Sequence, residues 1–191
     1  MNVKPRKRVV SLDVEGTERF PAMDPGARRV GSSDKGRSND LSKLRRTLIL
    51  CTGNSARSQM AEGLLRHDGA GRFQVESAGT RPSLVRPEAI EAMREIGIDI
   101  SGHRSKSVDE FVGRDFDHVI TVCDNAREIC PVFPSRTRMI HHSFEDPAAV
   151  EGTWDDRLEA FRRVRDEIRT YLREFATEVT GTDESGREPT T

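Results

Sequence analysis

The sequence predicts an α/β domain in which helices flank a four-stranded parallel sheet. Four short runs of apolar and β-branched residues, at 48–51, 73–79, 117–122 and 137–142, have the composition of strands. Segments with helical periodicity or helix-start signals stand between them, and a long helical segment follows the last run. Strands that alternate with helices in this way are typical of a parallel sheet.

The first strand, 48–51, ends at Cys51, and a helical pattern begins a few residues later. Its apolar positions recur at helical spacing: Met60, Ala61, Leu64 and Leu65. The second strand, 73–79, ends at Gly79, which predicts a turn there.

A second helix is expected to start at Pro87, because proline favours the first helical turn, and to end at Gly97. Ser107 and Glu110 have the spacing of a capping box, which predicts a short helix through Val112.

The third strand, 117–122, is continuous in apolar residues, as a strand buried on both faces should be, and it leads into Cys123. After the segment 124–130 and two prolines, the fourth strand is expected at 137–142. The last helix is expected over 153–177. Its apolar face consists of Leu158, Phe161, Val164, Ile168, Leu172 and Phe175.

The chain has 191 residues, enough for one domain with tails. Residues 1–44 are broken by prolines and glycines, which predicts a disordered charged extension. The domain is expected over 45–178, and a polar tail over 179–191. Residues 1–46 hold 12 Lys and Arg against 6 Asp and Glu, whereas the rest holds 19 against 26. An acidic domain disfavours nucleic acid as a partner, because phosphate backbones require a basic face.

No apolar run approaches the roughly 20 residues of a membrane helix, and the N-terminus lacks the apolar stretch of a signal peptide. Three cysteines, an odd number, suit a reducing compartment in which thiols do chemistry. These observations predict a cytoplasmic protein that does not bind membranes.

The candidate site is the turn after the first strand, where Cys51 is followed by Thr52, Gly53, Asn54, Ser55, Ala56, Arg57 and Ser58. Small and polar residues let backbone N–H groups converge on a tetrahedral oxyanion, and the helix N-terminus adds positive potential. The planar guanidinium of Arg57 can grip two oxygens of the same anion. These groups favour the thiolate of Cys51, and Ser58 is placed to donate a hydrogen bond to it. The alternative is that Cys51 is only a buried strand residue.

The run 51–59 resembles the phosphate loop of the low-molecular-weight tyrosine phosphatase superfamily, especially its thioredoxin-coupled arsenate reductase branch. The resemblance extends over about residues 46–175. It implies a three-layer fold in which Ser77, at the end of the second strand, braces the loop together with Asn54. It also nominates Asp146, which precedes a proline, as a general acid.

Cys123 and Cys130 are candidates for redox chemistry together with Cys51. Ligand sites in α/β folds lie beyond the carboxyl ends of the strands, so Cys51, Cys123 and the loop of Asp146 are expected on one rim. Seven residues of intact helix span about 10.5 Å along the axis, whereas a disulfide tolerates Cα separations up to about 7 Å. A bridge between Cys123 and Cys130 therefore requires 124–130 to unwind. Alternatively, both are packing residues.

The resemblance implies a relay. Arsenate binds in the loop, Cys51 attacks arsenic, and Asp146 protonates the departing oxygen. Cys123 then attacks Cys51 and arsenite leaves, after which Cys130 takes over the disulfide. The resemblance implies thioredoxin as the reductant, and the residues themselves leave a glutaredoxin system open.

Two other classes of function stay open. One is a tyrosine phosphatase that hydrolyses phosphoesters through Cys51, and the other is a non-catalytic oxyanion-binding or redox-sensing protein. The reductase is favoured because Ala56 stands where the phosphatases carry a second cysteine. Ala148 and Ala149 also stand where those enzymes carry tyrosines.

We expect a monomer that needs no cofactor and no metal. Some members of the resembled family hold potassium beside the loop, and Asn54, Glu62 and Ser77 match its ligands here. Lys106 stands where an acidic ligand is expected, and its ammonium takes the place of the cation. The histidines at 103, 118, 141 and 142 fit no ordinary metal-ligand spacing and are expected to form surface or strand-end hydrogen bonds.

Overall fold

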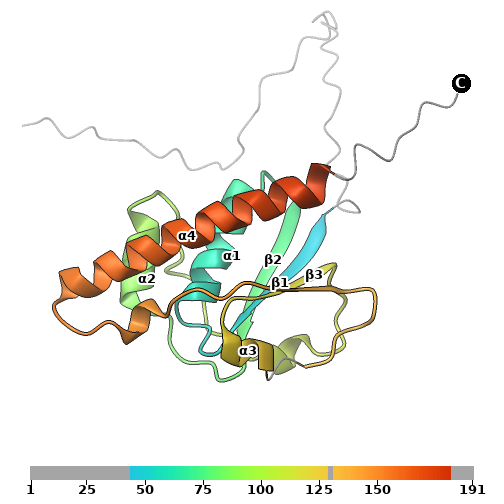
Figure 1. Ribbon diagram of the computed structural model, residues 1–191, viewed down its shortest axis with the longest axis horizontal. Coiled ribbons are helices and arrows are strands. Elements are labelled where there is room, and N and C mark those ends of the chain that lie inside the picture. Colours follow the sequence, from blue (N-terminus) through green and yellow to red (C-terminus); the bar gives the residue numbers. More distant parts are fainter. Residues whose placement is uncertain (1–43, 129–130, 182–191) are drawn as a thin grey trace, which may run out of the picture. The chain divides into compact units, whose positions relative to one another are not determined.

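The computed structural model describes residues 44–128 and 131–181 (Figure 1). They contain four strands: β1 (Arg45–Cys51), β2 (Phe73–Gly79), β3 (His118–Thr121) and β4 (Arg138–His141). The strands lie in the order β2-β1-β3-β4, and every neighbouring pair is parallel. The predicted fold class is confirmed.

The helical elements follow the predicted order. They are α1 (Arg57–Asp68), α2 (Pro87–Arg94), η2 (Val108–Phe111), α3 (Asp124–Glu128), η3 (Pro147–Ala149) and α4 (Trp154–Gly181). The segment after Ser107 has the predicted capping box but forms a 3₁₀ turn, not an α-helix. α4 continues four residues past the expected end at 177, because its buried face extends to Val179. The expected extension up to residue 43 and the tail after 181 lie outside the described residues.

The centre of the sheet is covered on both faces. Successive side chains of a strand point to opposite faces, and Leu48, Ile49 and Leu50 of β1 are all 0% exposed. α3 contacts β1 and β3, while α1 contacts β1 and β2. Both faces of β1 are therefore packed, as a three-layer arrangement requires.

α4 packs along α1 and α2 (Figure 1). The predicted apolar face is buried: Leu158, Phe161, Val164, Ile168, Leu172 and Phe175. Arg165 is also buried, and its guanidinium donates a hydrogen bond to the carbonyl of Ala92 at the α2 contact (2.7 Å). In the part of the chain that the structure describes, no helix is long and apolar enough to cross a membrane.

The parallel strands bring their carboxyl ends to one edge of the sheet. β1 ends there at Cys51, and Cys123 follows β3. The segment after β4 leads to Asp146, directly before η3. This edge carries the candidate site.

Candidate active site

Residues 51–58, which we call the oxyanion loop, lie against the end of β2. A Cβ atom on Gly79 would stand 2.6 Å from the carbonyl oxygen of Thr52 and 2.8 Å from the nitrogen of Asn54. Only glycine permits so close an approach at this position. Asn54 has a φ of 44°, a left-handed conformation that asparagine adopts more readily than most residues. The end of β2 therefore helps to fix the shape of the loop.

The segment after β2 binds carbonyl groups of the oxyanion loop. The backbone N–H groups of Ser83 and Arg86 donate to the carbonyl oxygens of Gly53 and Ser55, each at 2.9 Å. Since these carbonyls are directed at the neighbouring segment, they do not oppose an anion on the pocket side. The sequence did not reveal this support, because backbone N–H donors carry no motif.

Cys51 is 3% exposed, and two donors surround its sulfur. The backbone N–H of Asn54 donates to Sγ at 3.1 Å, and the Ser58 hydroxyl lies 2.9 Å from it. The predicted contact between Ser58 and Cys51 is therefore present. Hydrogen bonds of this kind stabilise a thiolate.

Asn54 is the central side chain of a buried polar network behind the loop. Its amide Nδ2 donates to Ser58 Oγ at 2.9 Å and to Ser77 Oγ at 2.8 Å. Its Oδ1 accepts from Gln59 Nε2 at 3.0 Å and from the backbone N–H of Lys106 at 2.8 Å. The predicted brace between Asn54 and Ser77 is present. The Asn54 side chain is directed away from the pocket, and its backbone N–H is the group that reaches the cysteine.

Lys106 supplies positive charge behind this network together with Arg66, whose guanidinium lies 2.7 Å from Glu62 Oε1. Ser77 Oγ donates to Glu62 Oε2, and Glu62 is 2% exposed. The ammonium of Lys106 lies 3.3 Å from the same carboxylate oxygen and 2.8 Å from Glu76 Oε2. A lysine ammonium thus occupies the position beside Glu62 where the sequence led us to expect it.

Arg57, the first residue of α1, faces the segment between β4 and η3. Its Nη1 donates to the carbonyl of Phe144 at 2.9 Å, and its Nη2 lies 3.2 Å from Asp146 Oδ2. Asp146 also accepts from the backbone N–H of Ala148. The candidate acid therefore lies directly beside the candidate anion-binding cation.

Cys123 reaches the same pocket from β3. Its sulfur lies 3.4 Å from the hydroxyl of Thr52 in the oxyanion loop. The next residue, Asp124, begins α3, and its carboxylate contacts His141 Nε2 at 3.0 Å and Ser143 Oγ at 3.1 Å. The other predicted relay cysteine, Cys130, lies outside the described residues.

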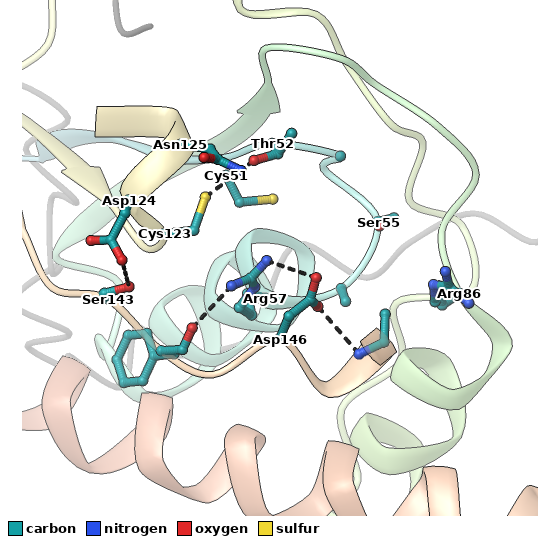
Figure 2. A pocket seen from close by; sticks show the side chains of 14 residues that line it. Cys51, Thr52, Ser55, Arg57, Arg86, Cys123, Asp124, Asn125, Ser143 and Asp146 are labelled. Atoms are coloured by element: carbon teal, nitrogen blue, oxygen red, sulfur yellow. Dashed lines mark hydrogen bonds and ion pairs between the residues drawn. The ribbon is translucent and has the colours of Figure 1, made fainter. Parts of the chain in front are cut away.

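Figure 2 shows the residues that line one pocket, among them Cys51, Arg57, Cys123 and Asp146. The lining includes most residues predicted from the sequence: Cys51, Thr52, Gly53, Ser55, Ala56, Arg57, Cys123 and Asp146. Asn54 and Ser58 support the loop from behind. Six lining residues were not predicted: Arg86, Asp124, Asn125, Ser143, Phe144 and Ala148. Asp124 follows β3 closely in the chain, so proximity to a strand end was the signal available for it.

Of the four histidines singled out above, two form polar side-chain contacts and a third stacks on an aromatic ring. His103 Nδ1 lies 2.9 Å from Gln59 Oε1, and burial lowers the pKa of His103. His141 Nδ1 lies 2.8 Å from the Thr121 hydroxyl in addition to its contact with Asp124. His142 stacks on Tyr171. Within residues 44–128 and 131–181, no three His, Cys, Asp or Glu side chains are arranged to hold a metal ion.

Comparison with known proteins agrees with this geometry. Residues 46–184 match the family model of the low molecular weight phosphotyrosine protein phosphatases. An arsenate reductase of Halalkalibacterium halodurans is 46% identical over 128 residues, which cover 67% of this chain and 92% of that protein.

Two solved structures are also similar. An arsenate reductase in a phosphate-binding state is 33% identical with a TM-score of 0.59, and the match covers 71% of this chain and 98% of that one. A thioredoxin-dependent arsenate reductase of Corynebacterium glutamicum is 26% identical with a TM-score of 0.60, over 74% of this chain and 65% of that one. The chain belongs to the low molecular weight phosphotyrosine protein phosphatase family.

Proposed function

We propose that this protein is an arsenate reductase that converts arsenate to arsenite through a relay of Cys51, Cys123 and Cys130. The observation that carries the proposal is the placement of Cys123 on the same pocket as Cys51, in contact with the oxyanion loop. A phosphoester hydrolase needs only the first cysteine. Reduction needs two electrons, which a second nearby thiol can supply.

In the first step, arsenate enters the oxyanion loop as a tetrahedral anion, and the Cys51 thiolate attacks arsenic. An arsenic–sulfur bond forms and an arsenic–oxygen bond breaks, and Asp146 donates a proton so that the oxygen leaves as water. The pair between Arg57 and Asp146 is relevant here. When arsenate oxygens bind the guanidinium, they compete with Asp146 for the same donor.

In the second step, the Cys123 thiolate attacks the Cys51 sulfur. The arsenic–sulfur electron pair goes to arsenic, so arsenic(V) becomes arsenic(III), arsenite leaves, and a disulfide joins Cys51 to Cys123. The Cys130 thiolate then attacks Cys123, which releases the Cys51 thiolate. The final disulfide joins Cys123 to Cys130, and an external dithiol reduces it.

We expect the last transfer to need local opening of the segment 124–130, of which α3 forms the first five residues. Seven helical residues span about 10.5 Å, which is longer than a disulfide allows. α3 is only five residues long, and its first side chain is exposed. An element this short opens locally at low free-energy cost.

Thioredoxin is the proposed reductant, by analogy with the Corynebacterium protein described above. The relay needs free thiols, which places it in a reducing compartment such as the cytoplasm. One chain supplies Cys51, Arg57, Cys123 and Asp146 to the pocket, and we propose that the protein acts as a monomer.

The test is to replace Cys123 with serine. Arsenate reduction with thioredoxin should fall more than about 100-fold, while hydrolysis of p-nitrophenyl phosphate should stay within about threefold of the native rate. Normal arsenate turnover in this variant would overturn the proposal. Retained phosphoester hydrolysis shows that the fold and the oxyanion loop remain intact.

A matched variant, Cys130→Ser, separates the two later steps. It should release about one equivalent of arsenite and then stop, with a disulfide between Cys51 and Cys123. In the native protein, one equivalent of arsenate should consume two thiols. Parallel assays with thioredoxin and with glutaredoxin plus glutathione would identify the reductant.

A further inference from the structure

Arg86 is a second arginine on the candidate site, and neither the motif nor the relay uses it. It precedes Pro87, the first residue of α2, and lines the pocket from the segment after β2. In Figure 2 it lies beyond Ser55, on the side of the pocket away from Cys123. Its side chain is exposed to solvent at the pocket rim.

The backbone of Arg86 is fixed, whereas its guanidinium is unpaired and acts on Glu88 only through its charge, which helps to lower the pKa of that carboxyl. The N–H of Arg86 donates to the Ser55 carbonyl, and its own carbonyl accepts from Ala89 and Ile90 at the start of α2. Among the described residues, no side chain forms an ion pair or hydrogen bond with its guanidinium. The carboxylate of Glu88 is already bound to Arg157 Nε at 2.9 Å.

The Arg86 guanidinium affects the balance of charge among the side chains that line the pocket. Two arginines, Arg57 and Arg86, face two carboxylates, Asp124 and Asp146. Arg57 is paired with Asp146 at 3.2 Å. Without Arg86, an approaching anion would meet a pocket in which carboxylates outnumber arginines. Arg86 restores the balance at the rim, where charges steer approaching ligands.

We propose that Arg86 is a specificity-determining residue that attracts anionic ligands into the pocket and gives no such advantage to neutral ones. This inference rests on the proposed function, because it is the reductase reaction that makes the distinction useful. Arsenate is an anion near neutral pH, whereas arsenite is an uncharged acid. Arg86 therefore favours entry of the substrate without retaining the product.

The test compares two alkylating reagents at Cys51. Iodoacetate is an anion and iodoacetamide is its neutral counterpart, and both form the same kind of thioether with the thiolate. Peptide mapping quantifies each product at Cys51. In Arg86→Gln, the ratio of iodoacetate to iodoacetamide rates should fall about three- to tenfold at low ionic strength. The difference should nearly vanish in about 1 M salt, where the Debye length is about 3 Å.

Arg81 provides the matched control, since it is an exposed arginine of the same segment that does not line the pocket. Arg81→Gln should leave the reagent ratio unchanged, and Arg86→Lys should keep most of the native ratio. The proposal is overturned if Arg86→Gln slows both reagents equally, if the ratio does not respond, or if Arg81→Gln lowers it as much.

Steady-state kinetics with arsenate show whether the residue that selects anionic reagents also assists the proposed substrate. In Arg86→Gln, kcat/KM for arsenate should fall by a factor similar to the alkylation ratio at low salt, with kcat unchanged. The alkylation readout does not depend on arsenate chemistry. If the native protein fails to reduce arsenate while the reagent ratio responds, the proposed function fails and the assignment of Arg86 to anion selection stands.

Discussion

The oxyanion loop and α3 line the same pocket, but they are held in place by different means. In the loop, Asn54 and Ser58 are both 0% exposed, and all four polar positions of the Asn54 amide have partners. The polar contacts of α3 lie at the surface, where the Asp124 side chain is 73% exposed.

This difference matches the two tasks of the proposed reaction. Anion binding and thiolate stabilisation require donors that are already in position before the ligand arrives. The disulfide transfer requires a segment that leaves its place easily. Buried, fully satisfied networks are costly to disturb, whereas exposed ion pairs contribute little.

The strongest way to break the comparison is to truncate one asparagine in each region. Asn54→Ala leaves buried Ser58, Ser77 and Lys106 groups without their partner. The free energy of unfolding should fall by about 2–4 kcal/mol. Activity should fall at least about 100-fold. Chemical denaturation and arsenate or phosphoester kinetics measure both effects.

The matched control is Asn125→Ala, because Asn125 is an exposed amide of α3 that lines the same pocket. We expect it to change the free energy of unfolding by less than about 0.5 kcal/mol. Equal losses of stability in the two variants would contradict the proposed difference between the regions.

The next largest effect is expected from Lys106→Met, which leaves the buried Glu62 carboxylate with Arg66 as its remaining cation, at 2.7 Å from Oε1. Because Arg66 still neutralises part of this charge, the free energy of unfolding should fall by about 1–2 kcal/mol. Adding Glu62→Gln removes the buried charge, and the double variant should recover part of the loss, because Arg66 is partly exposed and keeps its hydrogen bonds to the Val75 carbonyl.

The same lysine predicts how the native protein responds to salts. Because the Lys106 ammonium already lies beside Glu62, the melting temperature and activity should be equal in potassium and sodium chloride. A marked advantage of potassium in the native protein would show that a bound cation is still needed.

A smaller effect on stability, confined to one region, is expected from Asp124→Ala. This change removes the contacts to His141 and Ser143 at the surface. The free energy of unfolding should change by less than about 1 kcal/mol. Amide hydrogen exchange should rise several-fold in 124–128 and stay unchanged in 52–58. An equal rise in the oxyanion loop would show that the two regions open together.

The sequence predicted the backbone framework of the site well. The strand 73–79 matches β2 residue for residue, and the apolar stripe of the last helix is the buried face of α4. These features follow from local periodicity, which the chain displays directly. The contact between Cys51 and Ser58 followed from the strand–loop–helix pattern.

Contacts that depend on tertiary placement were not predictable in the same way. The pair between Arg57 and Asp146 joins residues 89 positions apart, and no local pattern marks it. The support of the loop carbonyls by Ser83 and Arg86 comes from backbone N–H groups, which every residue except proline has. The free guanidinium of Arg86 becomes visible only once the other charges of the pocket are seen to be paired.

The smallest expected effect is on how the free energy of unfolding depends on pH. It distinguishes global unfolding of the domain from local opening of α3. His118 of β3 is 7% exposed, its ring lies edge-on to Phe175, and its Nδ1 has no hydrogen-bond partner among the described residues. Burial lowers the pKa of His118. In the unfolded chain a histidine takes up a proton near pH 6.5. Stability from this residue is therefore complete above about pH 6.5 and is lost as pH falls toward the lower native pKa.

His118→Gln should make the free energy of unfolding less dependent on pH between 7 and 5, while part of the dependence remains because burial also lowers the pKa of His103. His118 belongs to the central sheet, so acid should raise exchange through global unfolding in the oxyanion loop and in α3 alike. The faster local exchange of α3 should persist at every pH. If lowering the pH instead removes the gap in exchange between the two regions, then α3 is not an independently opening unit.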